Sequence, residues 1–193
     1  DVFDPSLPFL WAIARDSKGT VYVGGGGLGG AKAKLFSIAG NQSKLVAELD
    51  GISVQAIAID AQDRVYAATS PDGKVYRIDA NGTASVFYDP KTKYIWSLAF
   101  GRNGDLFVAT GDQGEIHKVT PAGTPSVFFR TEETHARSLA ARGRGAGMRR
   151  WLIGLVALLV LSGAPATAAA ASIGSTPSCG VTRNSAMTSV SFG

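Results

Sequence analysis

Short hydrophobic runs alternate with polar turns between Asp1 and Ala140, and this pattern repeats. A small apolar triplet marks the first run of each repeat, and its copies begin at positions 12, 56, 97 and 138. The copies are Ala12-Ile13-Ala14, Ala56-Ile57-Ala58, Ser97-Leu98-Ala99 and Ser138-Leu139-Ala140. A period of about 40 to 45 residues is typical of four-stranded blades that stack around an axis. The pattern therefore predicts an all-β repeat structure.

Each repeat holds four apolar runs, which predict the four strands of an antiparallel meander. Turns with Lys-Gly, Asn-Gly or Asp-Gly steps separate many of the runs, as tight hairpins require. The predicted strands are 10–14, 21–23, 35–38 and 45–47, then 54–59, 65–67, 75–78 and 85–88, then 95–100, 106–108, 116–119 and 126–129. A fourth repeat supplies only a first strand at 135–140. Since propellers close with about four to eight blades, we expect a propeller fragment of three blades and one extra strand, with open blade faces.

The sequence motifs of the repeat also resemble those of a known kind of protein. Ala-Ile-Ala-x-Asp begins at Ala12 and again at Ala56, and Gly-x-Val-Tyr-Val begins at Gly19. Over residues 9–140 these motifs resemble bacterial β-propellers of the NHL type and the two-component-sensor type. The resemblance implies a scaffold that binds a ligand or a protein. Propellers similar to gluconolactonases hold a divalent cation on convergent carboxylates and Asn, and this sequence departs from that pattern, so we expect no metal and no cofactor.

The repeat stops after Ala140, and a different pattern begins. Residues 141–147 are rich in Gly and Arg and predict a linker or junction. A basic start at 148–150, an apolar run at 151–161 and a small-residue stretch to Ala171 follow in the order of a secretory signal peptide. We place the candidate cleavage site at Ala171. The uncharged run 151–171 is also long enough for a transmembrane helix, which would associate the chain with a membrane. A buried helix of the propeller is the third alternative.

The last stretch, residues 172–193, predicts the start of a second exported domain. Cys179-Gly180-Val181, followed by a short strand that ends in Phe192-Gly193, resembles the beginning of spore coat protein U-like domains. That resemblance implies a disulfide partner for Cys179 beyond the end of the chain. As a free-standing piece we expect this tail to be disordered. The predicted organisation is a partial β-propeller at 1–140, a junction at 141–147, a signal-peptide-like or transmembrane helix at 148–171 and this tail.

The distribution of charge and the single cysteine argue against several classes of function. Residues 1–133 carry 13 Lys and Arg against 15 Asp and Glu, a net charge of −2, whereas residues 134–193 carry six Arg and no acidic residue. The basic character therefore belongs to the tail, and no basic stripe is interleaved with aromatic residues, which argues against nucleic-acid binding. The single cysteine, Cys179, leaves the repeats without a disulfide framework or a cysteine-based metal site.

No catalytic constellation is recognisable, so the candidate residues are candidates for binding. Residues 25–30 fit Gly-x-Gly-x-x-Gly, but a strand rather than a helix follows, which argues against a dinucleotide site; the enlarged turn around Gly27 is a candidate binding loop. Trp11 and Trp96 share one register and either stack on a sugar or peptide or pack between blades. Tyr94 and His135 precede first strands, at positions near the central channel of a closed propeller. His117 is predicted to pack on a third strand.

These observations favour a non-catalytic propeller fragment, exported from a bacterial cell, that binds a protein, peptide or carbohydrate ligand. The first alternative is a fragment of a propeller enzyme, of lactonase or lyase type, whose catalytic residues lie in missing blades. The second is a membrane-tethered extracytoplasmic sensor, which requires residues 151–171 to be retained. Because three blades leave apolar faces open, self-association through these faces is also expected.

Overall fold

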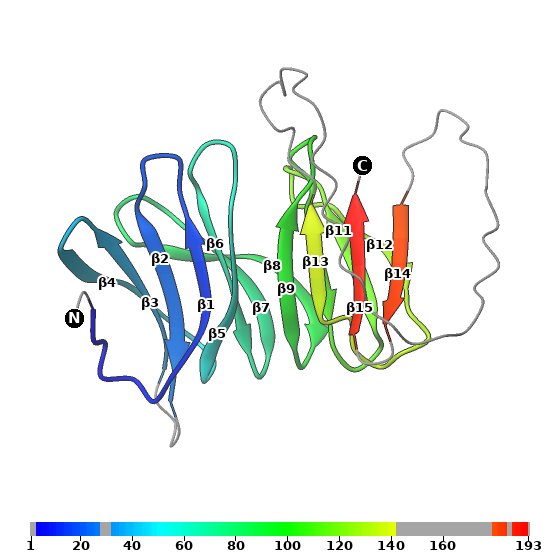
Figure 1. The fold of residues 1–193 in the computed structure, drawn as a ribbon, viewed down its shortest axis with the longest axis horizontal. Helices are drawn as coiled ribbons and strands as arrows, with labels where there is room; N and C mark the ends of the chain where they lie inside the picture. The colour runs from blue at the N-terminus through cyan, green and yellow to red at the C-terminus, as the bar shows by residue number, and fades with distance from the viewer. Residues whose placement is uncertain (1–2, 28–31, 142–178, 185–186, 193) are drawn as a thin grey trace, which may run out of the picture.

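The computed structural model describes residues 3–27, 32–141, 179–184 and 187–192, and across these ranges the backbone forms strands and turns without a helix (Figure 1). None of the described residues belongs to a helix that could cross a membrane. Most of the junction at 141–147 lies outside these ranges. The expected helix at 148–171, with its candidate cleavage residue Ala171, also lies outside them, so the alternatives for this segment stay predictions.

Each repeat forms one antiparallel meander, which we call a blade, and the twelve predicted strands are confirmed (Figure 1). Blade 1 consists of β1 (Phe9–Arg15), β2 (Val21–Gly26), β3 (Ala33–Ala39) and β4 (Gln42–Leu49). Blade 2 consists of β5 (Ser53–Ile59), β6 (Val65–Ser70), β7 (Gly73–Ile78) and β8 (Ala84–Thr92). Blade 3 consists of β9 (Ile95–Phe100), β10 (Leu106–Thr110), β11 (Glu115–Val119) and β12 (Pro125–Arg130). The local alternation of apolar and polar residues decided these elements.

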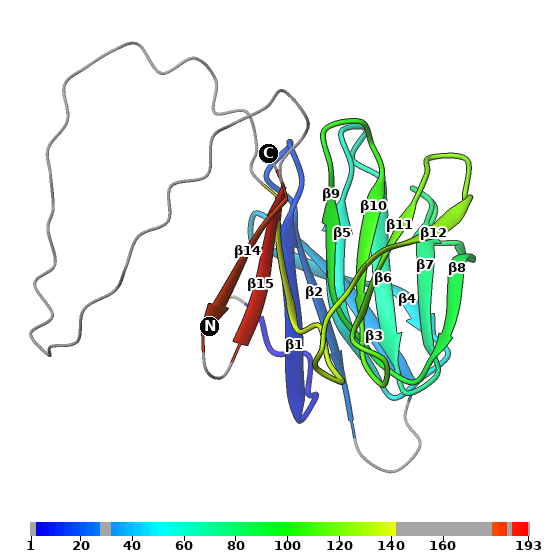
Figure 2. The same cartoon turned by 90° about the vertical axis from the view of Figure 1, so that its right-hand side faces the viewer.

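The blades stack so that their first strands lie together. β1 contacts β5, β5 contacts β9, and β9 contacts β13 (Ser138–Ala141), the first strand of the fourth repeat. In Figure 2 the first strands β5 and β9 lie near the middle of the view and the fourth strands β8 and β12 at its right-hand side. Blades 1 and 2 also join at one pairing, Gly26 with Ser53. This radial order, first strands inside and fourth strands outside, is that of a propeller.

A β-bulge recurs at the same place in the first strand of every complete blade. Trp11, Gln55 and Trp96 each fall between two paired residues and have no partner on the second strand. Each of them directly precedes the small apolar triplet of its repeat, so the bulge recurs with the period of the repeat. Because a bulge bends a strand and re-aims one side chain, each blade presents one redirected side chain at the same height of its inner strand.

Apolar side chains fill the space between successive blades. Leu35 and Leu49 of blade 1 pack with Val54 of blade 2, and a second cluster joins blades 2 and 3 around Ile95. Val54 and Ile95 are 0% exposed because the preceding blade covers them, whereas Leu10, at the equivalent place in blade 1, is 49% exposed. One face of blade 1 is therefore open, as the blade number predicts.

Two further strands follow the repeats. β14 (Cys179–Asn184) and β15 (Met187–Phe192) form a three-stranded sheet with β13, in the order β13-β15-β14. An edge strand such as β13 offers unpaired backbone groups, and β15 pairs with it in parallel from Ser189 to Phe192. The expectation that residues 172–193 are disordered as a free-standing piece stays a prediction.

Candidate functional site

One end of the blades carries all five candidate residues. In an antiparallel meander the start of the first strand, the turn between the second and third strands, and the end of the fourth strand lie at the same end. We call this end the loop end; it comprises residues 9–11, 24–27, 50–55, 70–74, 89–96, 110–115 and 131–137. Topology thus gathers short segments from all three blades and from the link that leads into β13.

Tyr94, Trp96 and His135 form an aromatic cluster at the loop end. The Tyr94 and Trp96 rings are stacked, with centroids 5.2 Å apart and planes 19° apart. The His135 ring stands edge-on to both, 5.8 Å from Trp96 at 88° and 6.5 Å from Tyr94 at 73°. These three candidate residues come from two successive repeats, and the packing of β9 against the fourth repeat brings them together.

Gly111, in the turn between β10 and β11, lies directly against this cluster. A Cβ atom at position 111 would lie 2.9 Å from both His135 Nδ1 and Trp96 Nε1 and 3.0 Å from Tyr94 Cβ. Both nitrogens are buried and find no hydrogen-bond partner among the described residues. A buried polar atom without a partner costs about 1–3 kcal/mol. Glycine at position 111 therefore permits a close ring arrangement that leaves two polar atoms unsatisfied.

Two cations flank the cluster. Lys93 Nζ lies 5.4 Å from the centroid of the Tyr94 ring, and Arg137 Cζ lies 5.9 Å from that of Trp96. Both side chains are exposed, and neither forms an ion pair within the described part of the chain. A cation over an exposed ring gains only about 0.5–1 kcal/mol, so both cations are available to a ligand.

The other two candidate residues lie apart from the aromatic cluster. The Trp11 ring packs against Phe9, with centroids 5.6 Å apart, and remains 53% exposed. Gly27 follows β2 and is buried. Packing requires glycine at the neighbouring position 26, because a Cβ atom there would clash with the Ile52 carbonyl oxygen. Close approach of two blades thus explains part of the glycine run, and a binding role for Gly27 stays a prediction because residues 28–31 lie outside the described ranges.

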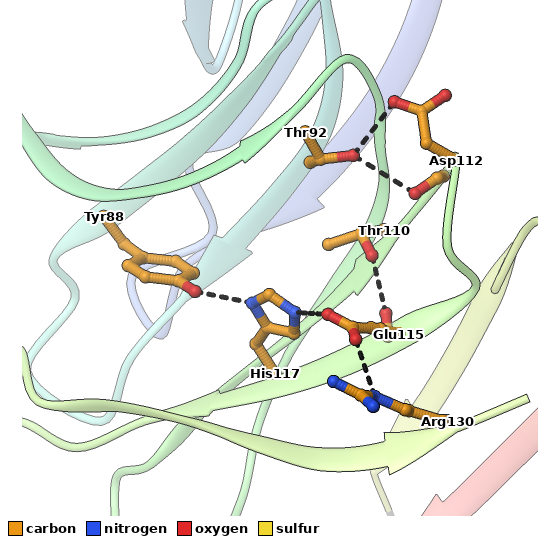
Figure 3. A network of polar contacts seen from close by, with 8 residues as sticks. Tyr88, Thr92, Thr110, Asp112, Glu115, His117 and Arg130 are labelled. Atoms are coloured by element: carbon orange, nitrogen blue, oxygen red, sulfur yellow. Dashed lines mark hydrogen bonds and ion pairs between the residues drawn. The ribbon is translucent and has the colours of Figure 1, made fainter.

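A buried polar network joins blades 2 and 3 beside the loop end (Figure 3). His117 Nε2 is hydrogen-bonded to Glu115 Oε2 at 2.7 Å, and His117 Nδ1 is hydrogen-bonded to the Tyr88 hydroxyl at 2.5 Å. Arg130 Nε donates to Glu115 Oε1 at 2.7 Å. The hydrogen bond from His117 and the charge of Arg130 lower the pKa of Glu115 although burial opposes the shift. Burial, with the negative charge of Glu115, raises the pKa of Tyr88 to about 12.

This network is a crosslink between blades. Both ring nitrogens of His117 and both carboxylate oxygens of Glu115 already have partners. Each polar side-chain atom of the pair thus has a partner within the protein, which agrees with the packing role predicted for His117 on its third strand. Within the described part of the chain, no group of three or more His, Cys, Asp or Glu side chains could hold a metal ion.

A cleft of about 500 Å³ opens between blades 2 and 3 at the loop end. Its charged lining residues include both signs and are Asp72, Lys74, Asp89, Lys91, Lys93 and Asp112. Asp112 Oδ2 accepts from the Lys93 backbone N–H at 2.9 Å, and Thr92 Oγ1 donates to the Gly111 carbonyl oxygen at 3.1 Å. Thr92 Oγ1 also lies 3.4 Å from Asp112 Oδ2 (Figure 3). Lys93 belongs to both the cleft and the aromatic cluster, so the two features form one continuous surface.

Sequence reasoning missed Gly111, Lys93 and Arg137. The repeat register contains a signal for Arg137, because position 137 continues the series of bulge positions 55 and 96 at the same spacing. No such signal exists for Gly111, whose importance comes from rings that only the tertiary structure brings beside it.

No protein-family model matches the chain, and no curated protein sequence matches it. Solved structures do match. A structure of the nidogen/laminin complex aligns with a TM-score of 0.54 at 16% identity, over 66% of this chain and 50% of that one. Two structures of virginiamycin B lyase from Staphylococcus aureus align at 17% identity. The catalytically inactive variant with quinupristin gives a TM-score of 0.52 over 65% of this chain and 42% of that one. The selenomethionine-substituted protein gives 0.50 over 62% and 40%.

The chain spans at most half the length of these matched structures. At such identities the likeness concerns the fold alone. Together with the radial strand order, it shows that residues 9–141 have an all-β, propeller-like fold of three four-stranded blades and the first strand of a fourth.

Proposed function

We propose that this chain is a non-catalytic binding scaffold, a propeller part whose ligand docks on the loop end over the aromatic cluster. The observation that carries the proposal is the meeting of Tyr94, Trp96 and His135 at the loop end, flanked by two exposed cations that form no ion pair with a described acidic side chain. Aromatic faces next to such cations are typical of a surface to which a ligand binds. A cleft of about 500 Å³ adjoins them.

The type of propeller and its cellular location are part of the same proposal. We infer an NHL-type or sensor-type propeller that works outside the bacterial cytoplasm, on the repeat motifs and the signal-like segment at 148–171. The start of a spore coat protein U-like domain at 172–193 fits an exported context. Retention of residues 151–171 would make the scaffold a membrane-tethered sensor, and cleavage would separate it from the tail.

A propeller enzyme of lactonase or lyase type is the alternative function. One of the matched folds is a lyase, and a neighbour of this kind shows that the fold accommodates catalysis. Within the described residues, however, the one buried acid–histidine pair, Glu115 and His117, has every polar side-chain atom occupied. The alternative therefore needs catalytic residues from outside the described ranges.

One binding experiment separates the scaffold from the enzyme. The chain is titrated calorimetrically with cellohexaose, hexagalacturonate and hexaglutamate at up to millimolar concentration, and each compound is then recovered for mass spectrometry. We expect at least one compound to bind, to lose affinity in Trp96→Ala, and to be recovered intact. Phe128→Ala, an exposed aromatic on the outermost strand β12, is the matched control and should bind normally. Absence of binding by all three compounds contradicts the scaffold, and a cleaved compound favours the enzyme.

A further inference from the structure

We propose that the loop end selects an acidic oligosaccharide, and that Lys93 and Arg137 are the residues that recognise its carboxylates. The ligand class is a pyranose that carries a carboxylate, such as a uronic acid residue. This inference rests on the proposed function and specifies the ligand for the same site.

Four side chains carry the argument, because they form two cation–ring pairs joined by ring stacking. Lys93 lies over Tyr94 at 5.4 Å, Tyr94 stacks on Trp96 at 5.2 Å, and Arg137 lies over Trp96 at 5.9 Å. Each ring thus has a cation over it that forms no ion pair with a described acidic side chain. A flat ring and a cation at one place match a ligand that presents a ring face and a negative charge together.

The weakness of the cation–ring contact explains the selectivity. A neutral sugar that stacks on either ring must displace a cation and offers it only uncharged hydroxyl oxygens as acceptors. A uronic acid can accept hydrogen bonds from the displaced cation while its ring takes the vacated aromatic face. A hydrogen bond from a cation to a carboxylate is stronger than one to a neutral hydroxyl and stronger than an exposed cation–ring contact. The exchange is therefore more favourable for the acidic ligand.

The attraction is local, because the propeller as a whole is slightly acidic. Residues 1–133 have a net charge of −2, so general electrostatic attraction does not favour an anion. The nearby carboxylate of Asp112 is engaged by the Lys93 backbone N–H at 2.9 Å and by Thr92 Oγ1 at 3.4 Å. These bonds fix the backbone of Lys93 and leave its side chain free to move.

The adjoining cleft gives room for more than one sugar unit. Lysines and carboxylates alternate in its wall, so that a carboxylate of the ligand meets cations only at particular places; the charged lining residues are Asp72, Lys74, Asp89, Lys91, Lys93 and Asp112. A volume of about 500 Å³ falls in the range of about 300–1,000 Å³ that is usual for small-molecule sites. An oligomer longer than one residue can therefore extend from the aromatic cluster between blades 2 and 3.

The test compares three six-unit probes by calorimetry at low salt: hexagalacturonate, the neutral cellohexaose and the acidic peptide hexaglutamate. We expect hexagalacturonate to bind about tenfold more tightly than either other probe, a ratio that corresponds to about 1.4 kcal/mol. Lys93→Gln and Arg137→Gln should each weaken hexagalacturonate about threefold to tenfold, whereas cellohexaose, which no longer has to displace a cation, should bind at least as tightly as before. Lys44→Gln, the same charge change on the exposed part of β4, is the matched control and should alter nothing.

The outcomes are distinct. Equal affinity for cellohexaose, or unchanged affinity in both glutamine variants, overturns the acidic-sugar inference while the binding scaffold stands. Equal affinity for hexaglutamate also overturns it, since charge alone would then suffice. Failure of all three probes to bind contradicts the proposed function itself. Because both cations are exposed, the variants should fold, and an unchanged melting temperature confirms that affinity rather than folding is measured.

Discussion

Replacement of Gly111 by alanine tests whether this glycine permits the aromatic cluster to form. The new Cβ would lie 2.9 Å from both Trp96 Nε1 and His135 Nδ1, closer than real Cβ contacts come. The turn cannot retreat easily, because the Gly111 N–H donates to the Tyr94 carbonyl oxygen at 2.9 Å and its own carbonyl accepts from Thr92 Oγ1 at 3.1 Å. The rings must therefore move.

The expected loss of stability in Gly111→Ala comes from overpacking alone. Gly111 is not in the left-handed region of φ, so alanine adds no backbone strain there. Forcing an extra methyl group into packed surroundings costs about 1–3 kcal/mol. For a chain of about 150–250 residues, each kcal/mol lowers the melting temperature by about 2–4 °C. We expect a loss of several degrees together with a change in the surroundings of Trp96.

The assay combines thermal unfolding with tryptophan emission. Trp11→Phe and Trp151→Phe in the background leave Trp96 as the single emitter. Gly123→Ala is the control, because a Cβ there meets nothing within 4 Å while its φ of +87° imposes backbone strain. We expect both glycine variants to lose stability and only Gly111→Ala to shift the Trp96 emission and to lose ligand affinity. Unchanged emission and stability in Gly111→Ala would refute the argument.

Three further predictions follow from the blade interfaces. Ile95→Ala, at a side chain that is 0% exposed between blades 2 and 3, should lower the free energy of unfolding by about 2–5 kcal/mol in chemical denaturation; Ile13→Ala, at a side chain that is 73% exposed, should change it by less than about 0.5 kcal/mol, and equal losses would contradict the interface. The folded-state pKa of Glu115 is lowered, so the ionised carboxylate stabilises the fold above the ordinary value of 4.5, and this stabilisation is lost as the pH falls. In denaturation experiments from pH 6 to pH 3, Glu115→Gln should lose less free energy of unfolding than the parent. Identical profiles would exclude a stabilising role for the Glu115 carboxylate. Because the folded-state pKa of Tyr88 is raised from 10.0 to about 12, the parent loses stability as the pH rises through this interval, and Tyr88→Phe should lose less; an unaltered alkaline profile would argue against a buried phenol.

Part of the candidate site could be predicted from the repeat itself. Tyr94 and His135 lie one repeat apart, at equivalent positions before β9 and β13, and this register placed both near the inner strands. The same register placed Trp11 in the site, yet Trp11 packs on Phe9 away from the cluster. The difference arises because equivalent positions of successive repeats lie in neighbouring blades, whereas β1 and β9 are two repeats apart, with blade 2 between them.

The sequence by itself determined the strands and their order. Local alternation, turn glycines and the regular period act through neighbours along the chain, so β1 to β12 could be placed without knowledge of distant contacts. Only the tertiary structure decided which side chains meet across blades. The stack of Tyr94 and Trp96 with His135, the space that Gly111 leaves and the link from Tyr88 to Glu115 depend on how twisted sheets pack. Such packing is set by bulges and by interfaces between distant residues, which periodicity in one strand does not encode.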